Sequence, residues 1–101
     1  MLHYIGVGVK YVLLKEAYML LKALMEAAKR IVGIKQTEKA VAKGIADRVY
    51  IACDADERIT EKLRELCMEK NVEVSEVESM DKLGKVCGIS VKAAVAAILK
   101  N

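Results

Sequence analysis

The stretch Arg48-Val49-Tyr50-Ile51-Ala52-Cys53 is apolar at every position after its arginine, so both of its faces avoid water. A strand that is buried on both faces lies at the centre of a sheet, with helices covering each side. This stretch therefore predicts a central strand between two helical layers.

Helices are predicted on either side of this strand in the sequence. In residues 12–31 the apolar positions recur every three or four residues, which predicts one long helix ending at Gly33. Residues 37–43 form a short second helix closed by Gly44. Downstream, a helix ends near Lys70-Asn71, with an apolar face made by Ile59, Leu63, Leu66 and Cys67.

The remaining third of the chain continues the alternation of strand and helix. Residues 72–77 alternate as a strand does, and Ser79 is placed to cap a helix through Val86, followed by Gly88. Residues 91–99 are rich in alanine, which favours a helix, but their two-faced apolarity favours a buried strand, which we prefer. The fold class is α/β, predicted as a three-layer α/β/α sandwich around a small mixed sheet of about four strands.

Composition limits the functions that this chain can have. With 101 residues it is one domain, and its four tyrosines without Phe or Trp argue against an aromatic platform for single-stranded bases. The net charge of +3 is mild, so a nucleic acid would have to meet a local basic face. The apolar run in residues 2–14 is interrupted by Lys10 and is too short to span a membrane, and no signal peptide is evident, which predicts a cytoplasmic protein.

The residues that usually carry catalysis or bind metals are scarce. The cysteines (Cys53, Cys67 and Cys87) are far apart, so they predict buried thiols rather than a disulfide framework or a zinc site. His3 is the single histidine. Asp54 and Asp56 precede a helix and are interpreted as cap residues, the alternative being a two-carboxylate metal or acid/base site. We expect no enzyme activity, no cofactor and no metal.

Two stretches stand out as candidate binding segments: residues 33–39 (GIKQTEK) and residues 77–84 (VESMDKLG). Both are predicted at strand-to-helix junctions, and such junctions meet at one edge of an α/β sheet, where ligands commonly bind. In the first stretch a glycine precedes a helix N-terminus, whose free amides and dipole favour a phosphate. Lysines add to this, although a lysine series is also typical of a solvated helix face: Lys35, Lys39 and Lys43, with Lys82 and Lys85.

The wording of these stretches resembles a known family. GIKQTEK resembles the G-x-[NK]-[EQ]-x-x-K signature of kink-turn RNA binders in the ribosomal L7Ae/L30e group, and the likeness continues through residues 52–56 (ACDAD) and 77–89 (VESMDKLGKVCGI). It covers residues 21–99 and is similar in particular to the short bacterial L7Ae-like ribosome-associated proteins.

The resemblance implies specific roles for both stretches. The first would enter the widened groove at tandem sheared G·A pairs, with Lys35, Gln36 and Lys39 at base edges and phosphates and Gly33 giving clearance. Archaeal relatives carry Asn-Glu where this chain has Lys35-Gln36, but glutamine and lysine can also serve base acceptors and phosphate. The second would cover the flipped-out bases of the bulge through Val77, Glu78, Ser79 and Met80, although a methionine there is also a common core residue. The complete set of expected RNA-binding residues is Gly33, Ile34, Lys35, Gln36, Thr37, Lys39, Lys43, Val77, Glu78, Ser79, Met80, Lys82 and Lys85.

Residues 1–18 lie outside the resemblance, so we expect an N-terminal extension followed by a kink-turn RNA-binding domain at residues 19–101. Residues 15–19 (KEAYM) can be encoded as a bacterial ribosome-binding sequence before a start codon, which favours a natural start at Met19. The alternative is a genuine helical extension through which residues 1–30 drive self-association; otherwise we expect a monomer.

The sequence thus predicts a non-catalytic protein that stabilises kink-turns in structured RNA. Ribosomal RNA, a riboswitch or another transcript would each supply such a motif, and ribosome association would follow from the first. The alternative is a protein-interaction scaffold of the same fold with no RNA target. A phosphate-loop enzyme is disfavoured because GIKQT lacks the second glycine and the Lys-Ser/Thr pair of that motif.

Overall fold

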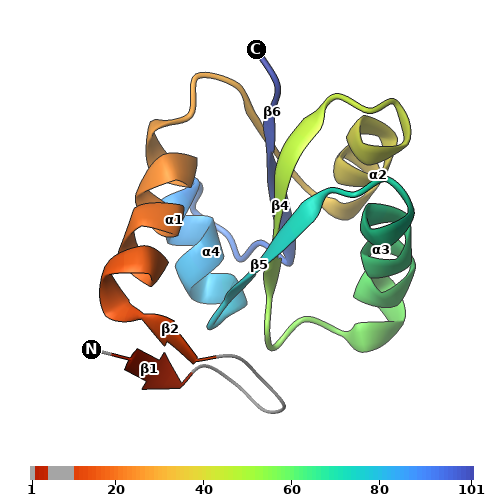
Figure 1. Ribbon diagram of the computed structural model, residues 1–101. Helices are drawn as coiled ribbons and strands as arrows, with labels where there is room; N and C mark the ends of the chain where they lie inside the picture. The colour runs from red at the N-terminus through yellow and green to blue at the C-terminus, as the bar shows by residue number, and fades with distance from the viewer. Residues whose placement is uncertain (1, 5–10) are drawn as a thin grey trace.

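The computed structural model describes residues 2–4 and 11–101, which form a four-stranded mixed sheet covered by helices on both faces, and a separate hairpin (Figure 1). The hairpin pairs β1 (Leu2–Tyr4) with β2 (Tyr11–Leu13). The other elements are α1 (Leu14–Glu26), β3 (Arg30–Val32), α2 (Ile34–Ala42), β4 (Ala46–Ala52), α3 (Glu57–Glu69), β5 (Glu73–Val77), α4 (Met80–Val86) and β6 (Val95–Leu99).

The strand order is β3-β6-β4-β5, with α1 and α4 on one face of the sheet and α2 and α3 on the other (Figure 1). β4 pairs in parallel with β5, whereas β6 is antiparallel to both β3 and β4. The carboxyl ends of β3, β4 and β5 and the start of β6 therefore lie together at one end of the sheet, the strand-end edge. This arrangement confirms the predicted α/β/α sandwich.

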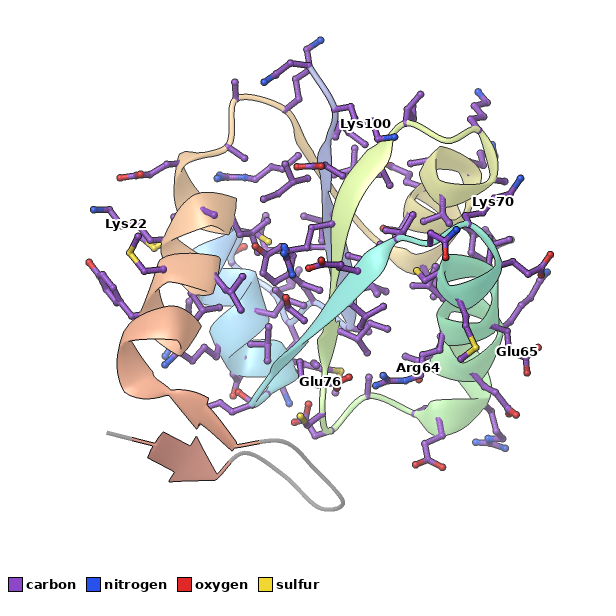
Figure 2. All side chains as sticks on the ribbon, viewed as in Figure 1. Lys22, Arg64, Glu65, Lys70, Glu76 and Lys100 are labelled. Atoms are coloured by element: carbon purple, nitrogen blue, oxygen red, sulfur yellow. The ribbon has the colours of Figure 1, made fainter. Side chains whose placement is uncertain are left out.

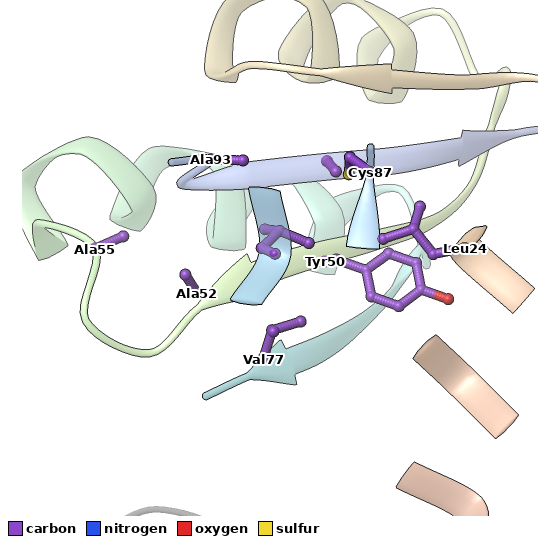
Figure 3. Close-up of a cluster of buried hydrophobic side chains, with 9 residues drawn as sticks. Leu24, Tyr50, Ala52, Ala55, Val77, Cys87 and Ala93 are labelled. Carbon is purple, nitrogen blue, oxygen red and sulfur yellow. The ribbon is translucent and has the colours of Figure 1, made fainter. Parts of the chain in front are cut away.

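The core consists of two apolar clusters, one on each face of the sheet. Strand β4 contributes to both, because Tyr50 and Ala52 point toward α1 and α4 while Val49 and Ile51 point toward α2 and α3. Figure 3 shows the first cluster around Tyr50. The Tyr50 hydroxyl donates a hydrogen bond to the carbonyl oxygen of Leu20 at 2.7 Å, and burial raises the pKa of Tyr50. The central strand is thus as buried as the sequence predicts.

The prediction of one helix over residues 12–31 is wrong at both ends. Residues 11–13 belong to the hairpin, and α1 stops at Glu26. Residues 30–32 form strand β3, in which Ile31 and Val32 pair with Ala97 and Ala96 of β6. β-Branched side chains pack well in a sheet, so pairing with β6 prevails over the helical spacing of the apolar residues.

Arg30 links the two helices that cover this face. Its guanidinium donates to the carbonyl oxygens of Leu24 at 3.1 Å and Met25 at 2.7 Å, in the last turn of α1. It also donates to the carbonyl oxygen of Cys87 at 3.0 Å, directly after α4. A single cation therefore satisfies the free carbonyl ends of two helices, where positive charge is favoured.

Ion pairs flank strand β5, which is one of the two outermost strands of the sheet. Arg48 of β4 bonds to Ser75 Oγ at 2.8 Å and pairs with Glu73. On the other face, Arg64 of α3 points toward Glu76 of β5 (Figure 2), with two contacts of 2.6 and 3.0 Å. Hydrogen bonding to Glu76 raises the pKa of Arg64.

Several smaller predictions are corrected or confirmed. Cys67 and Cys87 are buried as expected, and burial raises the pKa of each thiol, but Cys53 is exposed because it follows the end of β4. Ile59 is 47 % exposed, so it is not part of the buried face of α3. Within the part of the chain that the structure describes, no helix is long and apolar enough to cross a membrane. Among the same residues, no group of three or more His, Cys, Asp or Glu is placed to hold a metal.

Predictions about the start of the chain have a separate outcome. Those that concern Met1 and residues 5–10 fall outside the described residues. His3 belongs to β1. The assignment of residues 1–18 as an extension, and of Met19 as the natural start, stays a prediction.

Candidate nucleic-acid interface

Both candidate stretches begin at the same edge of the sheet. Gly33 directly follows β3, and Glu78 directly follows β5, and these two strands run in the same direction. Strands β6 and β4 lie between them, so the two stretches are separated by about 14 Å at the usual strand spacing. The strand-to-helix junctions therefore lie at the same end of the sheet, as the sequence predicts, but two strands separate them and they are not side by side.

The first stretch forms an open helix N-terminus. Gly33 is the N-cap of α2 with φ +117°, a conformation that glycine adopts without strain, and a Cβ there would meet nothing within 4 Å. Its amide donates to the carbonyl oxygen of Val95 at 3.0 Å, which ties the stretch to β6. Because glycine has no capping side chain and the first turn has no acidic residue, this end of α2 suits an anion.

Lysine and glutamine side chains surround this N-terminus. Lys35 and Gln36 are exposed in the first turn of α2, Lys39 is exposed one turn later, and Ile34 is half-buried against the core. Lys43 is also exposed, but it follows the other end of α2, about 13 Å along the helix axis. The group at the edge is therefore Lys35, Gln36 and Lys39, and Lys43 lies away from it.

Thr37 is corrected from a binding residue to a core residue. Its side chain is fully buried, and its Oγ1 has no hydrogen-bond partner among the described residues. It lies one helical turn from Ala40 and Val41, which face the sheet. A side chain in that position cannot contact RNA.

The second stretch contains both buried and exposed residues, whereas residues 77–80 were all predicted to contact RNA. Val77 is only 3 % exposed and belongs to the core, so its assignment to the cover is wrong. Alternation along β5 turns Val77 inward, whereas Glu78, after the strand, is exposed. Met80 is half-buried against the same core cluster, so the core interpretation holds for part of its side chain.

The N-terminus of α4 is already occupied by side chains. Ser79 Oγ accepts a hydrogen bond from the amide of Lys82 at 3.1 Å, which confirms the predicted cap. Asp54, expected to cap α3, instead accepts from the amide of Met80 at 2.8 Å, and Asp56 alone caps α3. Unlike α2, this helix end has side-chain acceptors for the amides of Met80 and Lys82 and carries nearby acidic groups, so it suits a phosphate less well.

The lysines of α4 belong to a helix on the opposite face of the sheet from α2 (Figure 1). Lys82 pairs with Glu78 at 3.3 Å, which partly neutralises its charge. Lys85 lies one turn further along α4 and lines a shallow groove of about 480 Å³ with Met25 and Val86. Both lysines are exposed and line this groove.

A third segment at the edge escaped prediction. Strand β6 begins at Val95 rather than at residue 91, and the preceding residues Ser90, Val91 and Lys92 are exposed, Val91 by 68 %. The amide of Ala93 donates to the carbonyl oxygen of Met80 at 3.1 Å, which places this segment beside the second stretch. The available signal in the sequence was a lysine next to a valine shortly after Gly88. It was overlooked because the apolar run through Leu99 favoured a strand that begins at residue 91.

Comparisons with known proteins agree with this architecture. The model of the ribosomal protein L7Ae/L30e/S12e/Gadd45 family matches residues 15–101, so the chain belongs to that family. An RNA-binding protein of Caldanaerobacter subterraneus subsp. tengcongensis is 48 % identical over 69 residues, covering 68 % of this chain and 84 % of that protein. The RNA-binding protein YbxF of Geobacillus stearothermophilus is 47 % identical over 77 residues, covering 76 % of this chain and 94 % of that protein.

Among solved structures, a 15.5kD RNA binding protein of Giardia lamblia superposes with a TM-score of 0.76 at 32 % identity. The match covers 85 % of this chain and 76 % of that one. Family membership and the predicted fold are therefore established together.

Proposed function

We propose that this protein recognises kink-turns in structured RNA and stabilises their kinked conformation. The observation that carries the proposal is the uncapped N-terminus of α2, where Lys35 and Gln36 are exposed beside the open space at Gly33. The RNA-binding names of the relatives support an RNA ligand, and the G-I-K-Q-T-E-K motif supports the kink-turn. Binding to one conformer shifts the folding equilibrium of the RNA without catalysis, a cofactor or a metal.

The two stretches would contact different parts of the RNA. Gln36 would read the sheared G·A pairs, while Lys35 and Lys39 would contact phosphates and base acceptors. The exposed parts of Glu78, Ser79 and Met80, together with residues 90–92, would cover the bulged nucleotides. Lys82, paired with Glu78, would contact phosphates beside the bulge. Lys43 and Lys85 lie farther from the edge and would serve the flanking duplex.

The cellular setting is also a proposal. We propose a cytoplasmic protein that acts as a monomer on ribosomal RNA, a riboswitch or another structured transcript, with ribosome association in the first case. The family description, which includes ribosomal proteins, supports that case.

The wild-type protein is expected to bind a kink-turn at least about tenfold more tightly than the same duplex without its three-nucleotide bulge, a difference of about 1.4 kcal/mol. Phosphate attraction alone should distinguish the two RNAs little, since the bulge adds only three phosphates to an otherwise equal backbone. Titration of both RNAs in moderate salt measures the ratio. Equal affinities would contradict the proposal and favour a protein-interaction scaffold, for which the exposed Tyr18, Met19 and Met25 of α1 offer a surface.

Gln36→Ala is expected to remove the discrimination between sheared G·A and Watson-Crick variants of the kink-turn, at a cost of about 1–3 kcal/mol for the correct RNA. The amide of Gln36 is exposed and can both donate to and accept from a base edge. The matched control is Lys85→Ala, which should weaken both RNAs equally and reduce the slope of log affinity against log salt by about one unit or less. Full discrimination by a folded Gln36→Ala protein would show that Gln36 does not read the RNA.

A further inference from the structure

Asp54 connects two loops at the candidate RNA-binding edge. It lies in the turn between β4 and α3, and its Oδ1 accepts a hydrogen bond from the amide of Met80 at 2.8 Å, across 26 positions of sequence. Met80 is the first residue of α4, so this bond fixes the point where the second stretch becomes helical. Just before it, the amide of Cys53 bonds to the carbonyl oxygen of Val77 at 2.7 Å, which extends the pairing of β4 with β5.

Met80 is held from the opposite side as well. Its carbonyl oxygen accepts from the amide of Ala93 at 3.1 Å, and Gly84 allows α4 to lie directly against the carbonyl of Val91. Three loops of the edge, at residues 53–56, 78–80 and 90–93, therefore meet at the backbone of one residue. Asp54 is the side chain that joins the first of them to the other two.

The charge of Asp54 makes this position informative. An exposed carboxylate at a surface that faces RNA phosphates weakens binding, because it repels the backbone. The amide that it accepts from is also lost as a phosphate donor. Since Asp54 is unfavourable for RNA binding in both respects, its role is better explained by the loops that it holds in place.

We propose that Asp54 is a positioning residue for RNA discrimination: it sets the place of residues 78–80 relative to the first stretch through the backbone of Met80 and does not touch the RNA. This inference rests on the proposed function. Without the carboxylate, the amide of Met80 turns to water and the first turn of α4 loosens, so the cover over the bulge loses its fixed position.

The experiment compares Asp54→Ala with Asp81→Ala, both titrated with kink-turn RNA and with plain duplex. Asp81 is an exposed carboxylate in the first turn of the same helix, but it makes none of the side-chain hydrogen bonds or ion pairs found among the described residues. Each variant removes one negative charge, so both should bind the plain duplex at least as tightly as the wild type. Only Asp54→Ala should lower the preference for the kink-turn, by about fivefold, the factor expected for the loss of one capping hydrogen bond.

Two more variants separate geometry from charge. Asp54→Asn keeps an acceptor oxygen in place and should restore most of the preference. Asp54→Glu keeps the charge but displaces the acceptor by one methylene, so it should lose the preference for the kink-turn. It also tests the inference if Asp54→Ala fails to fold. Unchanged preference in folded Asp54→Glu and Asp54→Ala would overturn the inference. A wild-type protein without any preference would instead refute the proposed function itself.

Discussion

Gly84→Ala is expected to lower the free energy of unfolding by about 3 kcal/mol, although alanine is the better helix former by about 1 kcal/mol. Gly84 lies inside α4, and a Cβ there would come within 2.2 Å of the carbonyl oxygen of Val91. That atom belongs to the backbone, so it cannot rotate away. The helix and the segment before β6 would have to separate, and chemical denaturation of the purified variant measures the loss.

Gly44→Ala is the matched control for the glycine at position 84. A Cβ at Gly44 would meet nothing within 4 Å, but the residue has φ +76°, so alanine there should cost about 1–2 kcal/mol from backbone strain alone. The two variants therefore test space and conformation separately. If Gly84→Ala were as stable as the wild type, the close packing of α4 on residues 91–92 would be wrong, and with it the placement of the second stretch.

Arg30→Met should destabilise the protein by about 2 kcal/mol, because it leaves carbonyl groups at the ends of α1 and α4 without their charged donor. Methionine keeps an unbranched apolar stem about as long as that of arginine, so the loss reports mainly on the guanidinium rather than on packing of the stem. We expect the loss to appear in thermal and denaturant unfolding, with the kink-turn preference retained at temperatures where the variant is folded.

Arg58→Met provides the comparison for Arg30. The side chain of Arg58 is 90 % exposed and pairs with Asp56, whose pKa is lowered by this hydrogen bond, so the substitution should change stability little. Equal stability losses in the two variants would mean that the bridge from Arg30 to both helices contributes nothing beyond a surface ion pair.

Features with a local cause could be predicted from the sequence. The burial of Val49, Tyr50 and Ile51 follows from their own apolar character, and the caps at Asp56 and Ser79 depend on residues two or three positions away. The G-I-K-Q-T-E-K motif located the first stretch for the same reason. Each of these features is contained in a short window of sequence.

Features with a distant cause were missed. Strand β3 has three residues and exists because β6, more than sixty positions later, pairs with it. The motif identified segments but not the direction of each side chain, so Thr37 and Val77 were assigned to the surface although both face the core. The role of Asp54 depends on Met80 across the edge, and no window around Asp54 contains that partner.

The two outermost strands of the sheet, β3 and β5, affect how the protein behaves at high concentration. An open edge strand can pair with the edge of a second copy, and this is a common first step in aggregation. Here one edge is β3, which is too short to offer a long ladder, and the other is β5, where Glu73 and Glu76 extend from opposite faces. Two copies that approached through β5 would bring these carboxylates close to each other, which is unfavourable. The acidic side chains of β5 thus disfavour growth of the sheet beyond its own four strands.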